Sequence, residues 1–189
     1  MTTRRVVTID DPLGKSTVLS DGPVPRSIPF QHIPGFVTTL AWATNAQPAV
    51  PTAPRDAAAS AVSWVPEPGG TRLLLITFPP DSVFRAEGFD PAAAGVEYGT
   101  ILPGLAERFE PENPGMHTTD TIDYGVILDG EIVLELDGGR QVALGTHDIV
   151  VQQGTRHAWR NPGDRAATVV FVLVGAQRRP LDFFAGQMA

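Results

Sequence analysis

Glycine and proline divide this chain into short segments. The sequence has 19 glycines and 18 prolines among 189 residues, and they recur at short intervals along its length. Between them lie brief runs with apolar residues at every second position, as in the stretch from Ile132 to Leu136. Short runs with this period, bounded by residues that break regular structure, are typical of β-strands. The pattern therefore predicts an all-β domain.

The expected strands form a weaker N-terminal group and a more strongly patterned C-terminal group. The clearest candidates are Arg4 to Ile9, Ser16 to Leu19, Phe36 to Thr44, Thr71 to Phe78, Val142 to Leu144, Ile149 to Gln152, His157 to Arg160 and Ala167 to Val174. The Asp129-Gly130 and Gly138-Gly139 pairs favour positive φ, so both are predicted to be hairpin turns.

We expect a single domain over residues 1–189, with four parts. They are an N-terminal β arm (1–33), the first barrel strands with a lid-like insertion (34–114), a motif core (115–177) and a C-terminal tail (178–189). The insertion carries too many apolar residues for a solvated loop, namely Val96, Tyr98, Ile101, Leu102, Leu105 and Phe109. It is expected to cover a pocket or, alternatively, to pack on the outside of the barrel or at a dimer interface.

Composition excludes several kinds of chemistry. The chain has no cysteine, so disulfides, thiolate metal sites and cysteine nucleophiles are absent. A formal net charge of -7 without a basic run disfavours nucleic-acid binding. No apolar run approaches the ~18 residues of a membrane helix, and the N-terminus does not resemble a secretory signal, so we expect a cytoplasmic protein without a membrane partner.

Two histidine-containing segments carry the candidate chemistry. Alternation along a strand places His117, Thr119, Thr121 and Asp123 on one face. In the second segment, His157 follows a strand and a glycine turn, and Trp159 shares its face, as a pocket wall or as core. Tyr124 should point away unless the strand bends. Arg156 and Arg160 flank His157 on the opposite face and are expected to be solvated, as is the acidic run that contains Glu110.

The first of these segments resembles the first motif of the cupin superfamily, whose members are small antiparallel barrels. His117 fits the first motif histidine, Asp123 stands at the glutamate position and Gly130 at the glycine. Thr119 stands where the second histidine belongs. The first motif is therefore degenerate in this chain.

The second segment resembles the second cupin motif, through Gly154, His157 and Asn161. More closely, the chain is similar to stand-alone cupins with a His-x-Thr-x-Thr-x-Asp-Tyr first motif and a Val-Gln-x-Gly-Thr-x-His-Ala-Trp second motif. The resemblance implies a cupin-type antiparallel β-barrel, which is a jelly-roll-like double-stranded β-helix, here with the N-terminal arm added.

The site admits two interpretations. His117, Asp123 and His157 could bind a divalent metal, either iron for oxygen chemistry or zinc or manganese for Lewis-acid chemistry. Without a metal, a carboxylate beside a histidine supports proton transfer. The candidate catalytic residues are His117, Thr119, Asp123 and His157. The candidate residues of the substrate pocket are Phe109, Thr121, Tyr124 and Trp159.

The leading functional hypothesis is an acid/base or Lewis-acid enzyme acting on a carbonyl-bearing metabolite. Isomerisation, cyclisation, dehydration and decarboxylation all belong to this class. The alternatives are a non-haem iron dioxygenase and a non-catalytic module that binds or senses a metabolite. Because two strand candidates precede the barrel without an obvious partner, we also expect a homodimer formed through residues 1 to 30.

Overall fold

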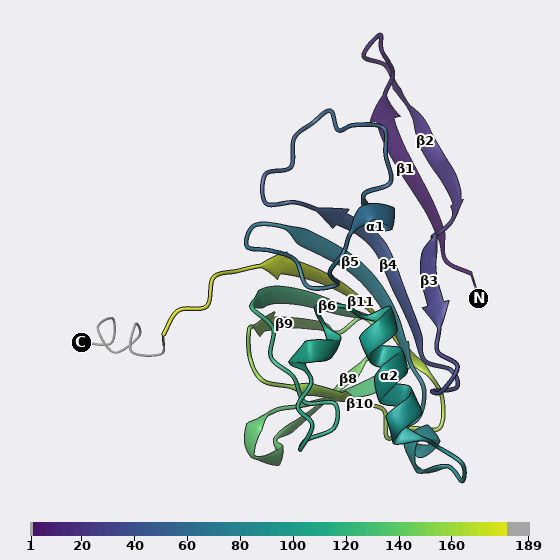
Figure 1. Ribbon diagram of the computed structural model, residues 1–189, viewed down its shortest axis with the longest axis vertical. Helices are drawn as coiled ribbons and strands as arrows, with labels where there is room; N and C mark the ends of the chain where they lie inside the picture. Colours follow the sequence, from purple (N-terminus) through teal and green to yellow (C-terminus); the bar gives the residue numbers. More distant parts are fainter. Residues whose placement is uncertain (1, 181–189) are drawn as a thin grey trace.

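The computed structural model describes residues 2–180, and antiparallel strands dominate it (Figure 1). The strands are β1 (Arg4–Asp10), β2 (Ser16–Pro23), β3 (Arg26–Pro29), β4 (Val37–Thr44), β5 (Thr71–Phe78), β6 (Thr121–Asp129), β7 (Glu131–Glu135), β8 (Gln141–Gly145), β9 (Ile149–Gln153), β10 (Ala158–Arg160) and β11 (Ala167–Gly175). The helices are α1 (Ala57–Ser60), α2 (Pro91–Ile101) and the 3-10 turns η1 (Asp81–Arg85), η2 (Ala106–Arg108) and η3 (Asp137–Gly139). Residues 181–189 of the predicted tail lie outside the described part.

Two sheets face each other and form the barrel. One has six strands in the order β3-β4-β5-β11-β6-β9, and the other has three in the order β10-β7-β8. Burial alternates residue by residue along β11, because this central strand turns every second side chain toward the interior. The apolar core lies between the sheets, where Ile127, Ile132 and Val169 are fully buried. The all-β prediction is therefore confirmed.

The turn at Asp129-Gly130 differs from the prediction. It joins β6 of the six-stranded sheet to β7 of the three-stranded sheet, and these strands are not paired with each other. It is therefore a corner between sheets rather than a hairpin. The Gly138-Gly139 turn does join paired strands, β7 and β8, as predicted, and both glycines have positive φ.

The insertion between β5 and β6 packs along the barrel. Asp90 caps the start of helix α2, and its side chain accepts hydrogen bonds from the amides of Ala92 and Ala93. The helix buries Ala94, and Leu102 just beyond its end is 2% exposed. Most apolar residues of the insertion thus pack as expected, but Val96 is 72% exposed, because it lies on the solvent side of α2.

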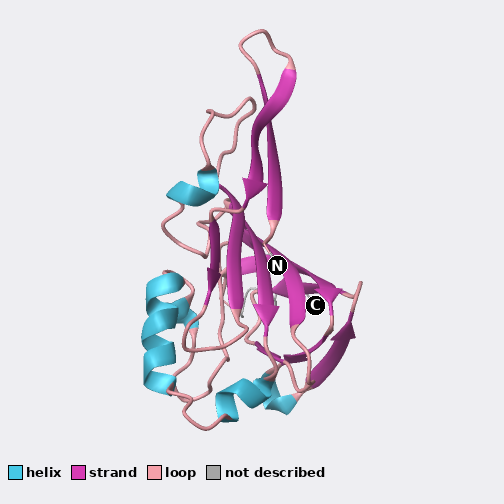
Figure 2. Cartoon of the chain, turned by 90° about the vertical axis from the view of Figure 1, so that its right-hand side faces the viewer, coloured by secondary structure: helices cyan, strands magenta, loops and turns pink. Residues whose placement is uncertain are grey.

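Strands β1 and β2 form a separate hairpin that extends away from the barrel (Figures 1 and 2). Its base is attached through Arg5, which pairs with Asp56 and lies over the Trp42 ring. Strand β3 was not predicted from the sequence, because Arg26–Pro29 is short and contains no apolar alternation. Among the described residues, no helix has the length and apolar character needed to cross a membrane.

Candidate functional site

His117 and His157 are brought together by a short backbone pairing. The amide of His117 donates to the carbonyl of His157 at 2.9 Å, and the reverse hydrogen bond is 3.0 Å long. The two imidazole rings lie with their centroids 4.3 Å apart. This pairing joins the segment before β6 to the segment before β10. The sequence prediction that the two histidine segments converge is correct in this respect.

Both histidines are held in the same tautomer by the chain immediately before them. Nδ1 of His117 lies 3.1 Å from the carbonyl oxygen of Gly115, and Nδ1 of His157 lies 2.9 Å from that of Thr155. A carbonyl oxygen only accepts, so each Nδ1 must carry the proton. Each Nε2 then has a free lone pair, and neither makes a hydrogen bond to a residue within 2–180.

Burial keeps both rings neutral. His157 is 3% exposed, and burial lowers its pKa to about 4, with a further lowering by His117 and a smaller opposing effect of the Thr155 carbonyl. Burial also lowers the pKa of His117. At neutral pH the site therefore contains two uncharged imidazoles that can accept a proton or a metal at Nε2.

Thr119, Thr121 and Asp123 continue along the inward face, as predicted. All three side chains are buried, and the Thr121 hydroxyl donates to that of Thr119 at 2.8 Å. Burial raises the pKa of the Asp123 carboxyl to about 6, and the neighbouring Thr121 hydroxyl opposes this rise. A carboxyl group with such a pKa can exchange protons near neutral pH.

The predicted metal set is only partly assembled. Across the described residues, no group of three or more His, Cys, Asp or Glu side chains is arranged to hold a metal ion. The two imidazoles present free Nε2 atoms, but the Asp123 carboxylate does not join them, and Thr119 replaces the further imidazole that would complete a set. These residues therefore do not fit a metal centre with three protein ligands.

Aromatic side chains surround the histidine pair. Phe109 of the insertion lies against His117 with ring centroids 4.7 Å apart, and Tyr98 of α2 lies behind Phe109. On the other side, Trp159 meets the edge of His157 at 6.0 Å. A closed circuit of neighbouring rings results, which we call the aromatic circuit: Phe36, Phe78, Trp159, His157, His117, Phe109 and Tyr98.

Two other residues of the histidine segments have different positions. Tyr124 is 46% exposed on the outer face of β6, so it does not line the interior, because the strand continues without the bend that would turn it inward. Asn161 is 2% exposed, and its amide group donates to the carbonyls of Phe78 and Arg165 while accepting from the amide of Gly163. Its role is to hold the turn before β11.

The segment before His117 is fixed by arginines that the sequence predicted to be solvated. Arg156 donates two hydrogen bonds to Glu110 and one to Asp137, each 2.6 Å long. Arg160 binds Glu135 and the carbonyl of Pro114. These two arginines and Glu110 stay partly exposed, as expected, but they are ion-paired as well as solvated.

Sequence reasoning missed Gln152, which is 4% exposed and directly opposite Asp123 in the pairing of β9 with β6. The available signal was a glutamine within an apolar strand that shares its inward face with Val150. Recognising it required the register between the two strands, which the sequence pattern did not provide.

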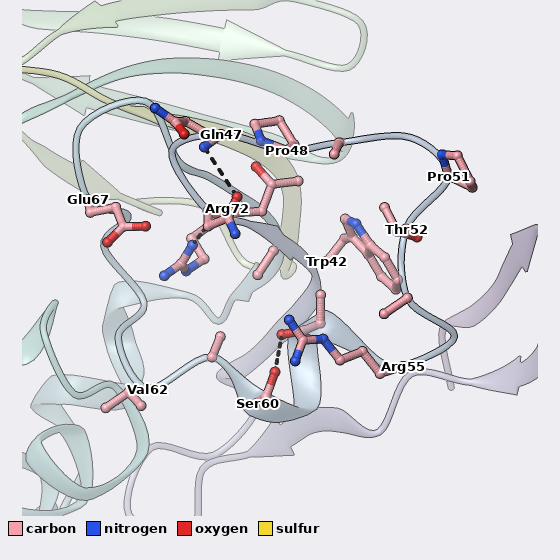
Figure 3. Close-up of a pocket in the computed structure, with 17 residues that line it drawn as sticks. Trp42, Gln47, Pro48, Pro51, Thr52, Arg55, Ser60, Val62, Glu67 and Arg72 are labelled. Carbon is pink, nitrogen blue, oxygen red and sulfur yellow. Dashed lines mark hydrogen bonds between the residues drawn. The ribbon is translucent and has the colours of Figure 1, made fainter. Parts of the chain in front are cut away.

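A separate hollow lies under the loop between β4 and β5 (Figure 3). It has a volume of about 470 Å³, and Trp42, Arg55, Glu67 and Arg72 contribute to its wall. None of the predicted site residues lines it. Arg72 already donates to the carbonyls of Ser63, Thr44 and Thr71. We therefore assign the candidate chemistry to the histidine pair, where buried groups have free proton-accepting atoms.

The two histidine segments lie within a stretch that matches a known protein family. Residues 106–173 match the cupin domain family model. The phomopsin biosynthesis cluster protein D of Diaporthe leptostromiformis is 44% identical over 90 residues, which cover 44% of this chain and 48% of that protein. A cupin-domain-containing oxidoreductase of Hypocrea virens is 37% identical over 46 residues, or 24% of each chain. The chain thus spans about half the length, or less, of the curated relatives it matches.

Among solved structures, a cupin domain from Bordetella pertussis Tohama I has a TM-score of 0.35 and 17% identity, covering 56% of this chain and 82% of that one. The family match includes both histidine segments, and they lie in an antiparallel barrel of the kind that the motifs predicted. Residues 106–173 therefore match a cupin domain, and the first motif within this stretch is degenerate.

Proposed function

We propose that this cupin is a small-molecule enzyme that moves a proton on a carbonyl-bearing metabolite. The observation that supports this most is the pair of buried, neutral imidazoles with fixed tautomers and free Nε2 atoms at His117 and His157. Isomerisation, cyclisation, dehydration and decarboxylation all need such a transfer. A cytoplasmic location and a soluble metabolite as partner are part of this proposal.

In the proposed reaction, Nε2 of a histidine removes a proton from the carbon next to the substrate carbonyl. Thr119 accepts the hydrogen bond of Thr121, so its own hydroxyl proton is free to donate to the carbonyl oxygen, where negative charge develops. The enolate is then reprotonated on carbon, either by the imidazolium that holds the abstracted proton or by Asp123, whose pKa of about 6 lets it carry a proton. In the second case the imidazolium gives its proton to solvent and Asp123 regains one from solvent. The aromatic circuit limits the access of water to the histidines.

The relatives support the substrate class only in outline. One is named for a biosynthesis cluster and one as an oxidoreductase, and both names are compatible with small-molecule chemistry. Neither name specifies a reaction for this chain, and each match covers less than half of the relative.

Hydrogen exchange with solvent tests the proposal directly. A panel of enolisable ketones and 2-oxo acids is incubated with the protein in D₂O, and loss of the α-proton signal is followed by NMR. We expect exchange that falls at least about tenfold in His117→Gln and His157→Gln, the effect of removing a general base. His32→Gln, at an exposed histidine outside the site, is the matched control. Exchange that all three variants retain would overturn the proposal.

A metal-dependent oxygenase is the second candidate. Histidines that ligate metals usually donate their second ring nitrogen to a carbonyl, as both histidines do here. Elemental analysis of protein purified without chelators, combined with oxygen consumption, separates the candidates: stoichiometric iron with oxygen uptake supports the oxygenase, and zinc or manganese supports Lewis-acid chemistry. Thr119→His should raise the affinity for metal if His117 and His157 bind one.

The third candidate is a non-catalytic module that binds or senses a metabolite. It predicts saturable binding without turnover, so a ligand that binds in calorimetry but is recovered unchanged, with its α-protons unexchanged, would favour it over both enzymes.

We also propose that the arm formed by β1 and β2 makes a homodimer. The hairpin pairs with no other strand in the described part of the chain, and Val6 and Val18 are 49% and 55% exposed. Deleting Met1 to Gly22 should convert a dimer to monomer or aggregate in size-exclusion chromatography with light scattering. An unchanged dimer would rule out the arm as the interface.

A further inference from the structure

Two polar side chains inside the barrel have unpaired atoms opposite each other. Asp123 on β6 and Gln152 on β9 are directly paired in register, and both point inward. Oδ1 of Asp123 and Nε2 of Gln152 are buried and have no hydrogen-bond partner among residues 2–180. A buried polar atom without a partner costs about 1–3 kcal/mol. This arrangement is expected where a ligand supplies the missing partners.

Gln152 is also connected to the histidine pair. The Thr155 hydroxyl donates to Oε1 of Gln152, which directs Nε2 of the amide away from Thr155. The carbonyl oxygen of the same Thr155 accepts the Nδ1 proton of His157. One turn, from Gln152 to His157, therefore orients both an amide donor and an imidazole acceptor.

The two unpaired atoms have complementary chemistry. The amide of Gln152 donates, and the carboxylate oxygen of Asp123 accepts. Side chains directly opposite each other on antiparallel strands have Cβ atoms about 5 Å apart. A ligand that satisfies both must therefore present an acceptor and a donor on neighbouring atoms. A carbonyl next to a hydroxyl, or the cis amide of a lactam, has this arrangement.

We propose that Gln152 and Asp123 select the substrate, and that it carries a carbonyl oxygen and a hydroxyl or N–H group on the same edge. Gln152 binds the carbonyl oxygen and Asp123 binds the donor. This inference rests on the proposed function, because it adds a substrate class to the same site. Gln152 is then a binding residue, which Thr155 positions.

A pair of small probes tests this class independently of turnover. The probe 2-pyrrolidone presents a cis C=O and N–H, whereas N-methyl-2-pyrrolidone lacks the N–H. Binding is followed through the side-chain amide signals of Gln152 in NMR titrations. We expect 2-pyrrolidone to shift these signals and to bind at least about tenfold more tightly than its N-methyl analogue, the effect of one charged hydrogen bond.

Variants assign the two contacts. Gln152→Leu should weaken both probes, since both have the carbonyl, whereas Asp123→Asn should reduce the preference for 2-pyrrolidone. Because Gln152→Leu lacks the reporting side-chain amide, binding to this variant and its controls is followed through the backbone amide of His157. Gln153→Leu, at the exposed neighbouring glutamine, is the matched control. Three outcomes would overturn the inference. The two probes could bind with equal affinity, or Gln152→Leu could bind them as tightly as the unmodified protein. Alternatively, neither probe could bind, with only an ordered water found between Gln152 and Asp123.

The test separates this inference from the proposed reaction. If the protein binds 2-pyrrolidone selectively but catalyses no α-proton exchange, the inferred substrate class is supported and the proposed proton-transfer reaction is rejected. If α-proton exchange depends on His117 and His157 but the two probes bind equally well, the proposed reaction is supported and the inferred substrate class is rejected.

Discussion

Arg156 joins the second histidine segment to the insertion, because its guanidinium binds both carboxylate oxygens of Glu110 at 2.6 Å. The two residues are 46 positions apart in the sequence. This ion pair lowers the pKa of Glu110 and fixes the chain between Phe109 and His117 against the second motif.

Replacing Arg156 by methionine should loosen this segment without unfolding the barrel. The amide of His117 is bonded to the carbonyl of His157, so its hydrogen exchange reports opening of the pairing. We expect faster exchange at His117 in Arg156→Met, and unchanged exchange in Arg140→Met, whose arginine is exposed. Protection of His117 equal to that of the unmodified chain would show that the Arg156–Glu110 pair does not hold the segment.

The site should also control how stability depends on pH. Asp123 has a pKa raised to about 6, so the folded state holds its proton where the unfolded state has lost it, and stability falls as pH rises from about 4 to about 6. His157 has a pKa lowered to about 4, so its contribution is complete above about 6.5 and is lost as pH falls toward 4. Each effect is of order 3 kcal/mol, at roughly 1.4 kcal/mol per pKa unit.

These opposed effects partly offset each other in the unmodified protein and are separated by single variants. Urea unfolding between pH 4 and pH 7 should show that Asp123→Asn gains stability as pH rises, whereas His157→Gln loses it. Parallel pH curves for the two variants would contradict the assigned pKa directions.

Gly130 should tolerate no side chain. Its φ is +80°, and a Cβ there would lie 2.8 Å from the carbonyl oxygen of Ala166 and 2.9 Å from Cα of Ala167, both in the backbone. Gly138 has a φ of +68° but open space around it, so Gly138→Ala meets only the strain of a positive φ. Thermal unfolding should show a larger loss for Gly130→Ala, by roughly 1–3 kcal/mol or more. Equal losses would mean that the corner relaxes.

Asn161 should contribute stability rather than chemistry. Asn161→Ala leaves the part-buried carbonyls of Phe78 and Arg165 without the side-chain donor, at a cost of roughly 1–3 kcal/mol. Asn45→Ala, at an exposed loop position, is the control. A loss of probe binding by Asn161→Ala at unchanged stability would contradict a purely structural role.

Local signals in the sequence predicted much of the fold. The strand from Thr71 to Phe78 was found because an apolar run ends there at a pair of prolines. The corner at Gly130 was misread because positive φ is compatible with a hairpin and with a change of sheet alike. Only the pairing of distant strands distinguishes these two cases.

In the candidate site, too, local patterns predicted some positions, and contacts between distant segments determined the others. Alternation placed Thr119, Thr121 and Asp123 on one inward face, and the motifs placed His157. The partners of Arg156 and the position of Gln152 depend on contacts between segments far apart in the chain, which a pattern along one strand does not contain. The sequence left open whether Tyr124 faces the interior, and it predicted that Val96 packs against the protein, whereas Val96 is exposed. In both cases the exposed side of the element depends on what packs against it.

The aromatic circuit has a consequence for the energetics of binding. Each ring touches two others, so none can change its rotamer unless its neighbours also move. The conformational entropy of ordering the walls is therefore lost when the chain folds, not when a ligand arrives. Preorganisation of this kind leaves more of the contact free energy for affinity.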